Sequence, residues 1–235
     1  MTDTPFLGER FDRALLRAHE LHHRQVAARY DEVPGGDRLL RAHELHHRQV
    51  RKGTQVPYVS HLLGVAALVL EHGGDEDQAI AGLLHDALED APGMIDGERL
   101  GEEFGGKVRR LVEACTDGDH GDALRGAEGW LSRKRAHLRH LEDVDERVLL
   151  VVAADKLHNL RSLVADVRTH GPGYLDRFNA PDRASTVWYY REMATLLARR
   201  LGGPLAAALA EAASQLGDLV GPAVERDAQP APGAL

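Results

Sequence analysis

The chain has 235 residues, a formal net charge of −8 at neutral pH and an apolar fraction of 43%. This length suffices for one domain with a sizeable core, and the acidic balance argues against a general nucleic-acid binder, which would carry a basic face. No apolar run approaches the roughly 18 residues of a membrane span, and the N-terminus does not resemble a signal peptide. Because a single cysteine, Cys115, cannot form an internal disulfide, these features together favour a cytoplasmic protein.

The N-terminal part of the chain contains an internal repeat. The sequence LLRAHELHHRQV spans residues 15–26 and recurs at residues 39–50. Pro34-Gly35-Gly36 predicts a turn between the two copies. Only the second copy runs directly into Arg51 and Lys52. We therefore assign the second copy to the main domain and expect the first to be an added helix, packed peripherally or against a partner chain.

The remainder of the chain predicts helices separated by turns. Ser60 is a candidate N-cap, and Asp75 with Gln78 fits a capping box. Residues 118–129 are polar and glycine-rich, which is typical of a loop. The expected helices cover residues 60–71, the segment from Asp75 to a stop at Pro92-Gly93, and residues 98–104, 107–115, 130–141, 146–168, 184–201 and 205–219.

The fold class expected from these helices is all-α, because the alternation typical of strands is nearly absent. We predict a single helical bundle. The expected organisation is an N-terminal extension with the duplicated helix at residues 1–36, the bundle domain at 37–219, and a disordered tail at 220–235.

Polar residues interrupt three otherwise apolar helical segments. They are His61, the pair His85-Asp86, and Asp155, which follows five apolar residues. Burying an imidazole or a carboxylate without a partner costs several kcal/mol, so we expect these four side chains to converge on one metal ion. Two nitrogen and two oxygen donors without a thiolate suit Mn²⁺, Fe²⁺ or Zn²⁺ with water in the open positions, rather than a structural zinc site.

Further polar residues share a helix face with these candidate ligands. Glu89 lies four positions after His85, Asp90 four after Asp86, and Asn159 four after Asp155. A metal ion lowers the pKa of its water and polarises a phosphoryl oxygen, and an acidic pair beside it can transfer protons. The pattern therefore predicts a metal-dependent phosphohydrolase with Glu89 and Asp90 as the catalytic pair.

The motifs also resemble a known family. Arg51-Lys52-Gly53-Thr54, Pro57-Tyr58-Val59-Ser60-His61, His85-Asp86-Ala87-Leu88-Glu89-Asp90 and Asp155-Lys156-Leu157-His158-Asn159-Leu160-Arg161 look like the HD-type hydrolase domain of the RelA/SpoT homologues, in the family's order. Stand-alone small alarmone hydrolases are the closest comparison. The resemblance covers roughly residues 39–201.

This resemblance implies an all-α domain that holds one Mn²⁺ and removes the 3′-diphosphate of ppGpp or pppGpp as pyrophosphate. The ligands that it implies are His61, His85, Asp86 and Asp155, and the acidic pair is Glu89 with Asp90. The substrate-binding residues that it implies are Arg51, Lys52 and Asn159, together with the basic pair Arg133-Lys134.

Alternatives remain open for the substrate and for catalysis itself. The segment after Lys52 is longer than in the family, so the base that this chain recognises stays open. The substrate could instead be ppApp or the 2′-phosphate of NADPH, or the domain could sense a nucleotide without hydrolysing it. Glu89 and Asp90 favour an enzyme, because a sensor needs no acidic pair. The expected partner is a small anionic nucleotide rather than nucleic acid or membrane, and swapping of the repeated helix makes a homo-oligomer plausible.

Overall fold

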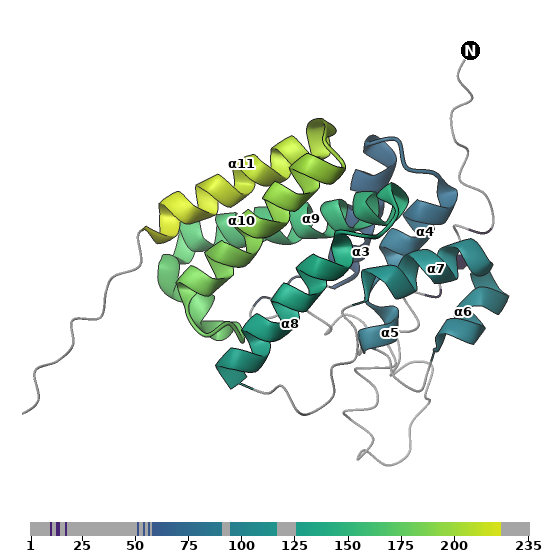
Figure 1. The fold of residues 1–235 in the computed structure, drawn as a ribbon, viewed down its shortest axis with the longest axis horizontal. Coiled ribbons are helices and arrows are strands. Elements are labelled where there is room, and N and C mark those ends of the chain that lie inside the picture. The colour runs from purple at the N-terminus through teal and green to yellow at the C-terminus, as the bar shows by residue number, and fades with distance from the viewer. Residues whose placement is uncertain are drawn as a thin grey trace, which may run out of the picture.

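The computed structural model describes residues 10, 13, 14, 17, 51, 54, 56, 58–90, 95–116 and 126–221, leaving out the side chains of Val59 and Asp90. All regular elements of this part are helical, so the prediction of an all-α fold is confirmed (Figure 1). The α-helices are α3 (Val59–Glu71), α4 (Glu76–Leu84), α5 (Ala87–Asp90), α6 (Gly97–Phe104), α7 (Gly106–Cys115), α8 (Gly126–Leu141), α9 (Glu146–His170), α10 (Arg183–Arg200) and α11 (Gly203–Val220), with a 3-10 helix η2 (Pro172–Arg177) between α9 and α10.

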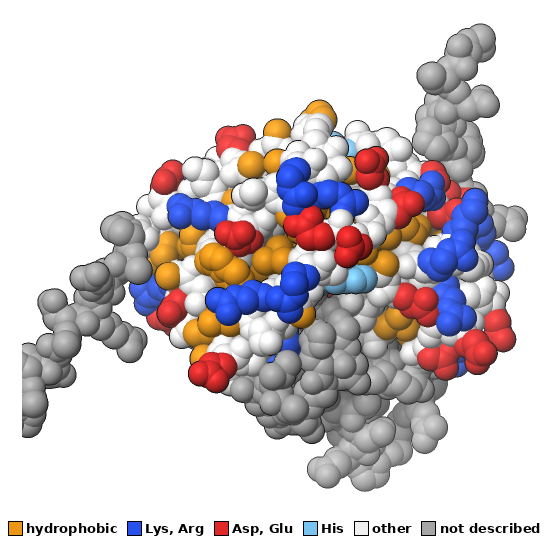
Figure 2. Space-filling model, in the orientation of Figure 1, with side chains coloured by type: hydrophobic (Ala, Val, Ile, Leu, Met, Phe, Trp, Pro, Cys, Tyr) orange, Lys and Arg blue, Asp and Glu red, His pale blue; other side chains and the backbone are white. Residues whose placement is uncertain are grey.

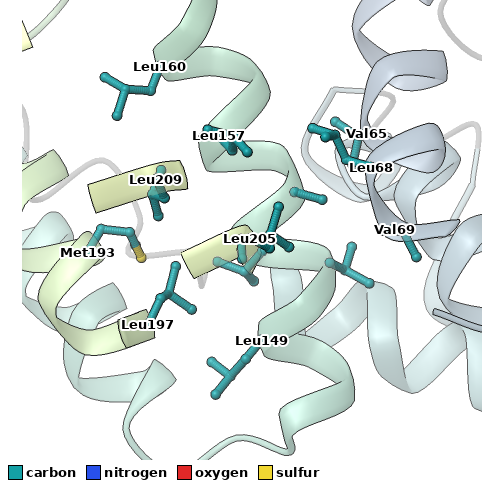
Figure 3. Close-up of a cluster of buried hydrophobic side chains, with 14 of the residues drawn as sticks. Val65, Leu68, Val69, Leu149, Leu157, Leu160, Met193, Leu197, Leu205 and Leu209 are labelled. Atoms are coloured by element: carbon teal, nitrogen blue, oxygen red, sulfur yellow. The ribbon is translucent and has the colours of Figure 1, made fainter. Parts of the chain in front are cut away.

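Helix α9 is the centre of the bundle. It packs against α10 and α11 on one side and against α3 and α4 on the other (Figure 1). The core follows this arrangement, and Figure 3 shows leucines of α9 between side chains of these neighbours. The labelled core residues are Leu149, Leu157 and Leu160 of α9, Met193 and Leu197 of α10, Leu205 and Leu209 of α11, and Val65, Leu68 and Val69 of α3. None of the described helices is long and apolar enough to cross a membrane.

Local signals explain where the helices of the centre begin and end. The predicted capping box is present at α4, where the side chain of Asp75 accepts from Gln78 and the side chain of Gln78 accepts from Asp75. The long helix α9 starts after its N-cap Asp145 and stops at Gly171, whose φ of 81° suits glycine. The expected cap at Ser60 was wrong, because α3 begins one residue earlier without a side-chain cap.

The helix that we expected to run from Asp75 to Pro92 is broken at His85 and Asp86. Helix α4 ends at Leu84, and α5 begins at Ala87. Nδ1 of His85 lies 2.9 Å from the carbonyl oxygen of Gly82, which in a continuous helix would accept from the backbone of Asp86. The imidazole of His85 thus contacts the carbonyl oxygen that the backbone N–H of Asp86 would use if the helix continued.

Helix α10 anchors the junction between α8 and α9. Arg199 donates to both carboxylate oxygens of Glu142 at 2.6 Å, and Arg200 donates to the carbonyl oxygens of Leu141 and Val144 at 3.3 and 2.8 Å. Figure 2 shows Lys and Arg side chains interspersed with Asp and Glu over this face. Helix α8 itself starts at Gly126, four residues before the predicted start at Trp130.

The described residues of the N-terminal extension pack on the bundle. Ala14 has no exposed surface and belongs to the core, and Arg17 pairs with Glu103 of α6 at 3.0 Å. Arg10 pairs with Asp77 of α4. Arg17 is the residue of the first repeat copy that the structure describes, so the expectation that this copy packs peripherally or against a partner chain stays a prediction. The second copy, Lys52 and residues 222–235 lie outside the described part.

Candidate metal centre and its two cavities

The structure brings the four predicted ligands together. His61 comes from α3, His85 and Asp86 from the break after α4, and Asp155 from the middle of α9. Nε2 of His85 lies 3.4 Å from Nε2 of His61, 3.1 Å from Oδ2 of Asp86 and 3.5 Å from Oδ1 of Asp155. Nε2 of His61 lies 3.3 Å from Oδ1 of Asp155 and 4.0 Å from Oδ2 of Asp86.

Four of these five separations fit neighbouring donors that share one ion, because donor atoms about 2.1 Å from a single cation lie about 3 to 3.5 Å apart at tetrahedral or octahedral angles. The 4.0 Å between His61 and Asp86 fits donors on opposite sides of an octahedral ion. His61, His85 and Asp86 form a group with donor atoms within 4.8 Å of one another, and Asp155 joins it through its contacts with the two histidines. The set is nitrogen and oxygen without sulfur, which suits Mn²⁺, Fe²⁺ or Zn²⁺ and leaves the choice among them to experiment.

Both imidazoles are held by the ring nitrogen that faces away from the centre. Nδ1 of His85 contacts the carbonyl oxygen of Gly82, and Nδ1 of His61 lies 2.9 Å from Nδ1 of His158. With a proton on each Nδ1, both Nε2 atoms would offer a lone pair to an ion bound between the carboxylates. Partners of this kind orient ligating histidines in metal sites.

The two carboxylates are also fixed by neighbours. The hydroxyl of Tyr58 donates to Oδ2 of Asp86. Asn159 donates to Oδ1 of Asp155 at 2.6 Å, and Lys156 donates to Oδ2 of the same residue at 2.7 Å. The side chain of Asp155, buried in the middle of an apolar helix, therefore has partners for both of its oxygens.

The electrostatics of the centre favour a positive charge between the carboxylates. Burial would lower the pKa of His85, but Asp86 and Asp155 outweigh it and hold this pKa well above its usual value. Burial would likewise raise the pKa of both aspartates, but His85 and, for Asp155, also Lys156 keep them ionised with lowered pKa values. Burial and the nearby His61 and Arg51 lower the pKa of His158 to about 4, so its ring is neutral at neutral pH.

A larger cavity of about 470 Å³ opens on one side of the centre. Its wall is partly aromatic, and Arg51 reaches into it. Nη1 of Arg51 donates to Oγ of Ser162 at 2.6 Å, and Nη2 donates to Oδ1 of Asn159 at 2.9 Å. The lining residues are Arg51, Thr54, Val56, Tyr58, Asn159, Ser162, Leu163, Ala165, Asp166, Tyr174, Phe178 and Tyr190.

A smaller cavity of about 120 Å³ includes three of the candidate ligands in its wall. Lys134 enters it from α8, and Nζ of Lys134 lies 4.9 Å from the ring centroid of Tyr189. Burial, together with the charge of Asp155, raises the pKa of Cys115 to about 12, so this thiol is a poor nucleophile. The lining residues are His85, Asp86, Glu89, Cys115, Lys134, Val151, Val152, Asp155 and Lys156.

The other predicted site residues divide between these cavities. Arg51 and Asn159 line the larger one, and Glu89 and Lys134 the smaller one. Arg133 is half-buried on α8 and lines neither of the two. Lys52 and the side chain of Asp90 fall outside the described part of the chain, so their roles stay predictions.

Several residues of the larger cavity were not predicted from the sequence. Ser162 and Asp166 continue the face of α9 that carries Asp155 and Asn159, at helical spacings of three and four, and this signal could have found them. Tyr174 belongs to the 3-10 helix, which has no periodicity long enough to predict.

Part of the chain is similar in sequence to known proteins. An HD-domain family model matches residues 39–172, more than half of the chain. A guanosine-3′,5′-bis(diphosphate) 3′-pyrophosphohydrolase, MESH1, from Xenopus tropicalis is 39% identical over 111 residues, covering 46% of this chain and 57% of that protein. A probable GTP pyrophosphokinase from Mycobacterium leprae is 39% identical over 107 residues, covering 46% of this chain and 13% of that protein.

The fold itself is found in a solved structure. The metazoan SpoT orthologue described as hydrolysing ppGpp superposes with a TM-score of 0.63 at 24% sequence identity, covering 90% of this chain and 98% of the other. The aligned part of this chain spans about half, or much less, of the length of the curated relatives named above.

Proposed function

The chain belongs to the HD-domain family, and we propose that it is a metal-dependent phosphohydrolase that removes the 3′-diphosphate of a purine alarmone, ppGpp or pppGpp, as pyrophosphate. The observation that carries this proposal is the position of the cluster of His61, His85, Asp86 and Asp155 between two cavities. His85, Asp86 and Asp155 line the smaller cavity, which also holds two lysines. Tyr58 and Asn159, which donate to Asp86 and Asp155, line the larger, partly aromatic one. The names of the MESH1 relatives support the same substrate.

The four clustered side chains would hold the ion, and Mn²⁺ is our first choice, with Fe²⁺ and Zn²⁺ as alternatives. When bound there, the metal supplies a water of lowered pKa and polarises a phosphoryl oxygen. The protein contributes the orientation of the donors, because Gly82, His158, Tyr58 and Asn159 each hold one of them in place.

The larger cavity would bind the nucleoside. Tyr174, Phe178 and Tyr190 offer apolar ring surface on which a purine can pack. The guanidinium of Arg51 is already fixed by Ser162 and Asn159, so little conformational freedom is lost when it meets an anionic ligand. Asn159 lines this cavity and donates to Asp155 of the ligand cluster, so we expect the ribose and its 3′-oxygen to lie beside it.

The smaller cavity would receive the diphosphate. Lys134 and Lys156 line it and can neutralise phosphate oxygens. In the reaction, a water oxygen bonds to the phosphorus attached to the ribose, and the bond from this phosphorus to the 3′-oxygen breaks. Glu89, which lines the same cavity, accepts the proton of the water, and a proton ends on the 3′-hydroxyl of the product.

A second candidate substrate is favoured by one further observation. The cavity of about 470 Å³, the larger of the two beside the ligand cluster, adjoins a third cavity of about 550 Å³ that is lined by Arg177. The two share Thr54, Val56, Asp166 and Tyr174. This space could hold the second half of a dinucleotide, as in NADPH losing its 2′-phosphate. A role in nucleotide sensing alone is less favoured, because Glu89 lines the cavity beside the ligand cluster.

A substrate panel tests this proposal. Purified protein loaded with Mn²⁺ is incubated with ppGpp, pppGpp, ppApp, NADPH and GMP, and released phosphate and pyrophosphate are measured separately. We expect pyrophosphate from ppGpp and pppGpp. Phosphate released only from NADPH would establish the second candidate, and phosphate released only from GMP would rule out both.

A further inference from the structure

We propose that His158 and Gly64 form a positioning pair for the ligand His61, an inference that rests on the metal centre proposed above. His158 comes from α9 and His61 from α3, and their rings lie with centroids 4.9 Å apart at an interplanar angle of 56°. Gly64 lies on α3 three residues after His61, so it shares the helix face that meets His158.

The hydrogen bond between the two imidazoles fixes which nitrogen of His61 is available. Their Nδ1 atoms are 2.9 Å apart, so one of them must carry the proton and the other must accept it. Because Nε2 of His61 faces Nε2 of His85 and Oδ1 of Asp155, a ligating Nε2 requires the proton of His61 to be on Nδ1. Nδ1 of His158 is then the acceptor, and its lone pair selects the tautomer of His61 that can bind a metal.

Gly64 is the residue that lets His158 reach this position. A Cβ atom built on Gly64 would lie 2.3 Å from both Cδ2 and Nε2 of His158, far inside van der Waals contact. Gly64 sits within the regular helix α3, so no special backbone conformation requires glycine there. Glycine destabilises a helix interior relative to alanine. The close approach of the His158 ring gives a physical reason for glycine at this position.

The ring of His158 is therefore held from two directions. The backbone of α3 at Gly64 blocks movement on one side, and the hydrogen bond to His61 fixes the opposite edge. A shift of His158 of the size that a Cβ at Gly64 would force breaks this hydrogen bond, and the ring of His61 is then free to turn Nε2 away from the cluster.

The test measures Mn²⁺ binding by titration calorimetry and needs no substrate. The variants are Gly64→Ala, His158→Ala, the double variant of both, and His158→Asn, whose amide oxygen can stand near the place of Nδ1. Gly101→Ala is the matched control, because a Cβ there meets only the flexible side chain of Arg109, with the nearest atom at 3.2 Å. Melting temperatures confirm that each variant is folded.

We expect His158→Ala to raise the Kd for Mn²⁺ about 10- to 100-fold and Gly64→Ala to raise it in the same direction. The double variant has no ring to clash with, so its Kd should match that of His158→Ala within about twofold. His158→Asn should recover part of the affinity, and Gly101→Ala should bind as the wild type does.

Three results would overturn the inference: wild type that binds no Mn²⁺, His158→Ala that binds Mn²⁺ as tightly as the wild type, or effects of Gly64→Ala and His158→Ala that simply add. Failure of the proposed function looks different, because wild type would then bind Mn²⁺ with the expected dependence on Gly64 and His158 but release no pyrophosphate from ppGpp.

Discussion

The side-chain amide of Asn159 donates a hydrogen bond of 2.6 Å to Oδ1 of Asp155, one helical turn before it on α9. The carbonyl oxygen of the same amide accepts from Arg51 at 2.9 Å. Donor and acceptor are therefore both in use, which fixes the orientation of the amide. Asn159 connects the ligand cluster to the cationic group of the larger cavity.

Replacing Asn159 by aspartate should weaken the Asp155 end of this connection. The side chain keeps its size and an oxygen that accepts from Arg51, but the donor is lost and a second carboxylate faces Asp155. We expect the Kd for Mn²⁺ to rise about tenfold or more, since a hydrogen bond to a charged group contributes about 1.5 to 3 kcal/mol. The KM for ppGpp should also rise, because the new carboxylate competes with the substrate for Arg51. Ser162→Ala is the control, because it removes the other partner of Arg51 without touching Asp155. It should change KM only, and equal effects of the two variants on metal binding would contradict the assignment.

Neutralising Glu89 should separate catalysis from binding. Glu89→Gln keeps the shape of the side chain in the smaller cavity but cannot accept a proton, so we expect kcat to fall about 10²- to 10⁴-fold. Metal affinity should stay unchanged, because Glu89 is not among the clustered donors. Glu142→Gln, at the ion pair with Arg199, serves as the control. Addition of Asp90→Asn tests the second member of the predicted pair, and turnover within a few-fold of wild type would refute the role of both.

The raised pKa of His85 predicts how pH affects the ion-free protein. A group whose pKa is higher in the folded state stabilises the fold fully below its unfolded pKa of about 6.5, and this stabilisation is lost as pH rises through the folded value. The melting temperature of EDTA-treated wild type, relative to His85→Gln, should therefore fall as pH rises above about 6.5. Mn²⁺ requires the neutral ring, so the stabilisation that Mn²⁺ adds should grow as pH rises in the same direction. A shift with Mn²⁺ that is independent of pH would argue against His85 as a ligand.

The sequence predicted the cluster better than it predicted the cavities. His61, His85, Asp86 and Asp155 stand out because ionisable groups inside apolar helices need partners, and the structure places their donor atoms within 4.0 Å of one another along the measured pairs. The break after Leu84 was not foreseen, since it depends on a bond from the His85 side chain to a backbone carbonyl, which helical periodicity does not reveal.

The larger cavity could not be predicted because it forms only when distant segments pack. Its wall combines Arg51, the α9 face with Ser162, Tyr174 of the 3-10 helix and Tyr190 of α10. In the sequence, each of these residues is typical of an ordinary surface or core position, so none of them predicts a cavity.

The ion pairs of Arg10 with Asp77 of α4 and of Arg17 with Glu103 of α6 predict which repeat copy packs against these two helices. Ala14, directly before the first copy, is fully buried, whereas the matching residue before the second copy is Arg38. Ala14→Arg would bury an unpaired charge, so we expect a loss of several kcal/mol in the free energy of unfolding.

Adding Arg38→Ala to this variant should restore stability, because the second copy could then take the place of the first. The HD-domain match begins at residue 39, the start of that second copy, which supports such an exchange. Chemical denaturation of the two variants checks this. An Ala14→Arg protein as stable as the wild type would show that the first copy does not pack against α4 and α6.

We propose that one ion held by His61, His85, Asp86 and Asp155 is required for removal of the 3′-diphosphate. The most direct measurement titrates metal-free protein with Mn²⁺ and follows pyrophosphate release from ppGpp, in wild type and in Asp155→Asn. We expect release by the wild type to rise with added Mn²⁺ until each chain holds a single ion, with GDP as the nucleotide product, and Asp155→Asn to stay inactive over the same range. Wild type that releases no pyrophosphate at saturating Mn²⁺, or that releases it equally well without any metal, would contradict this role of the ion.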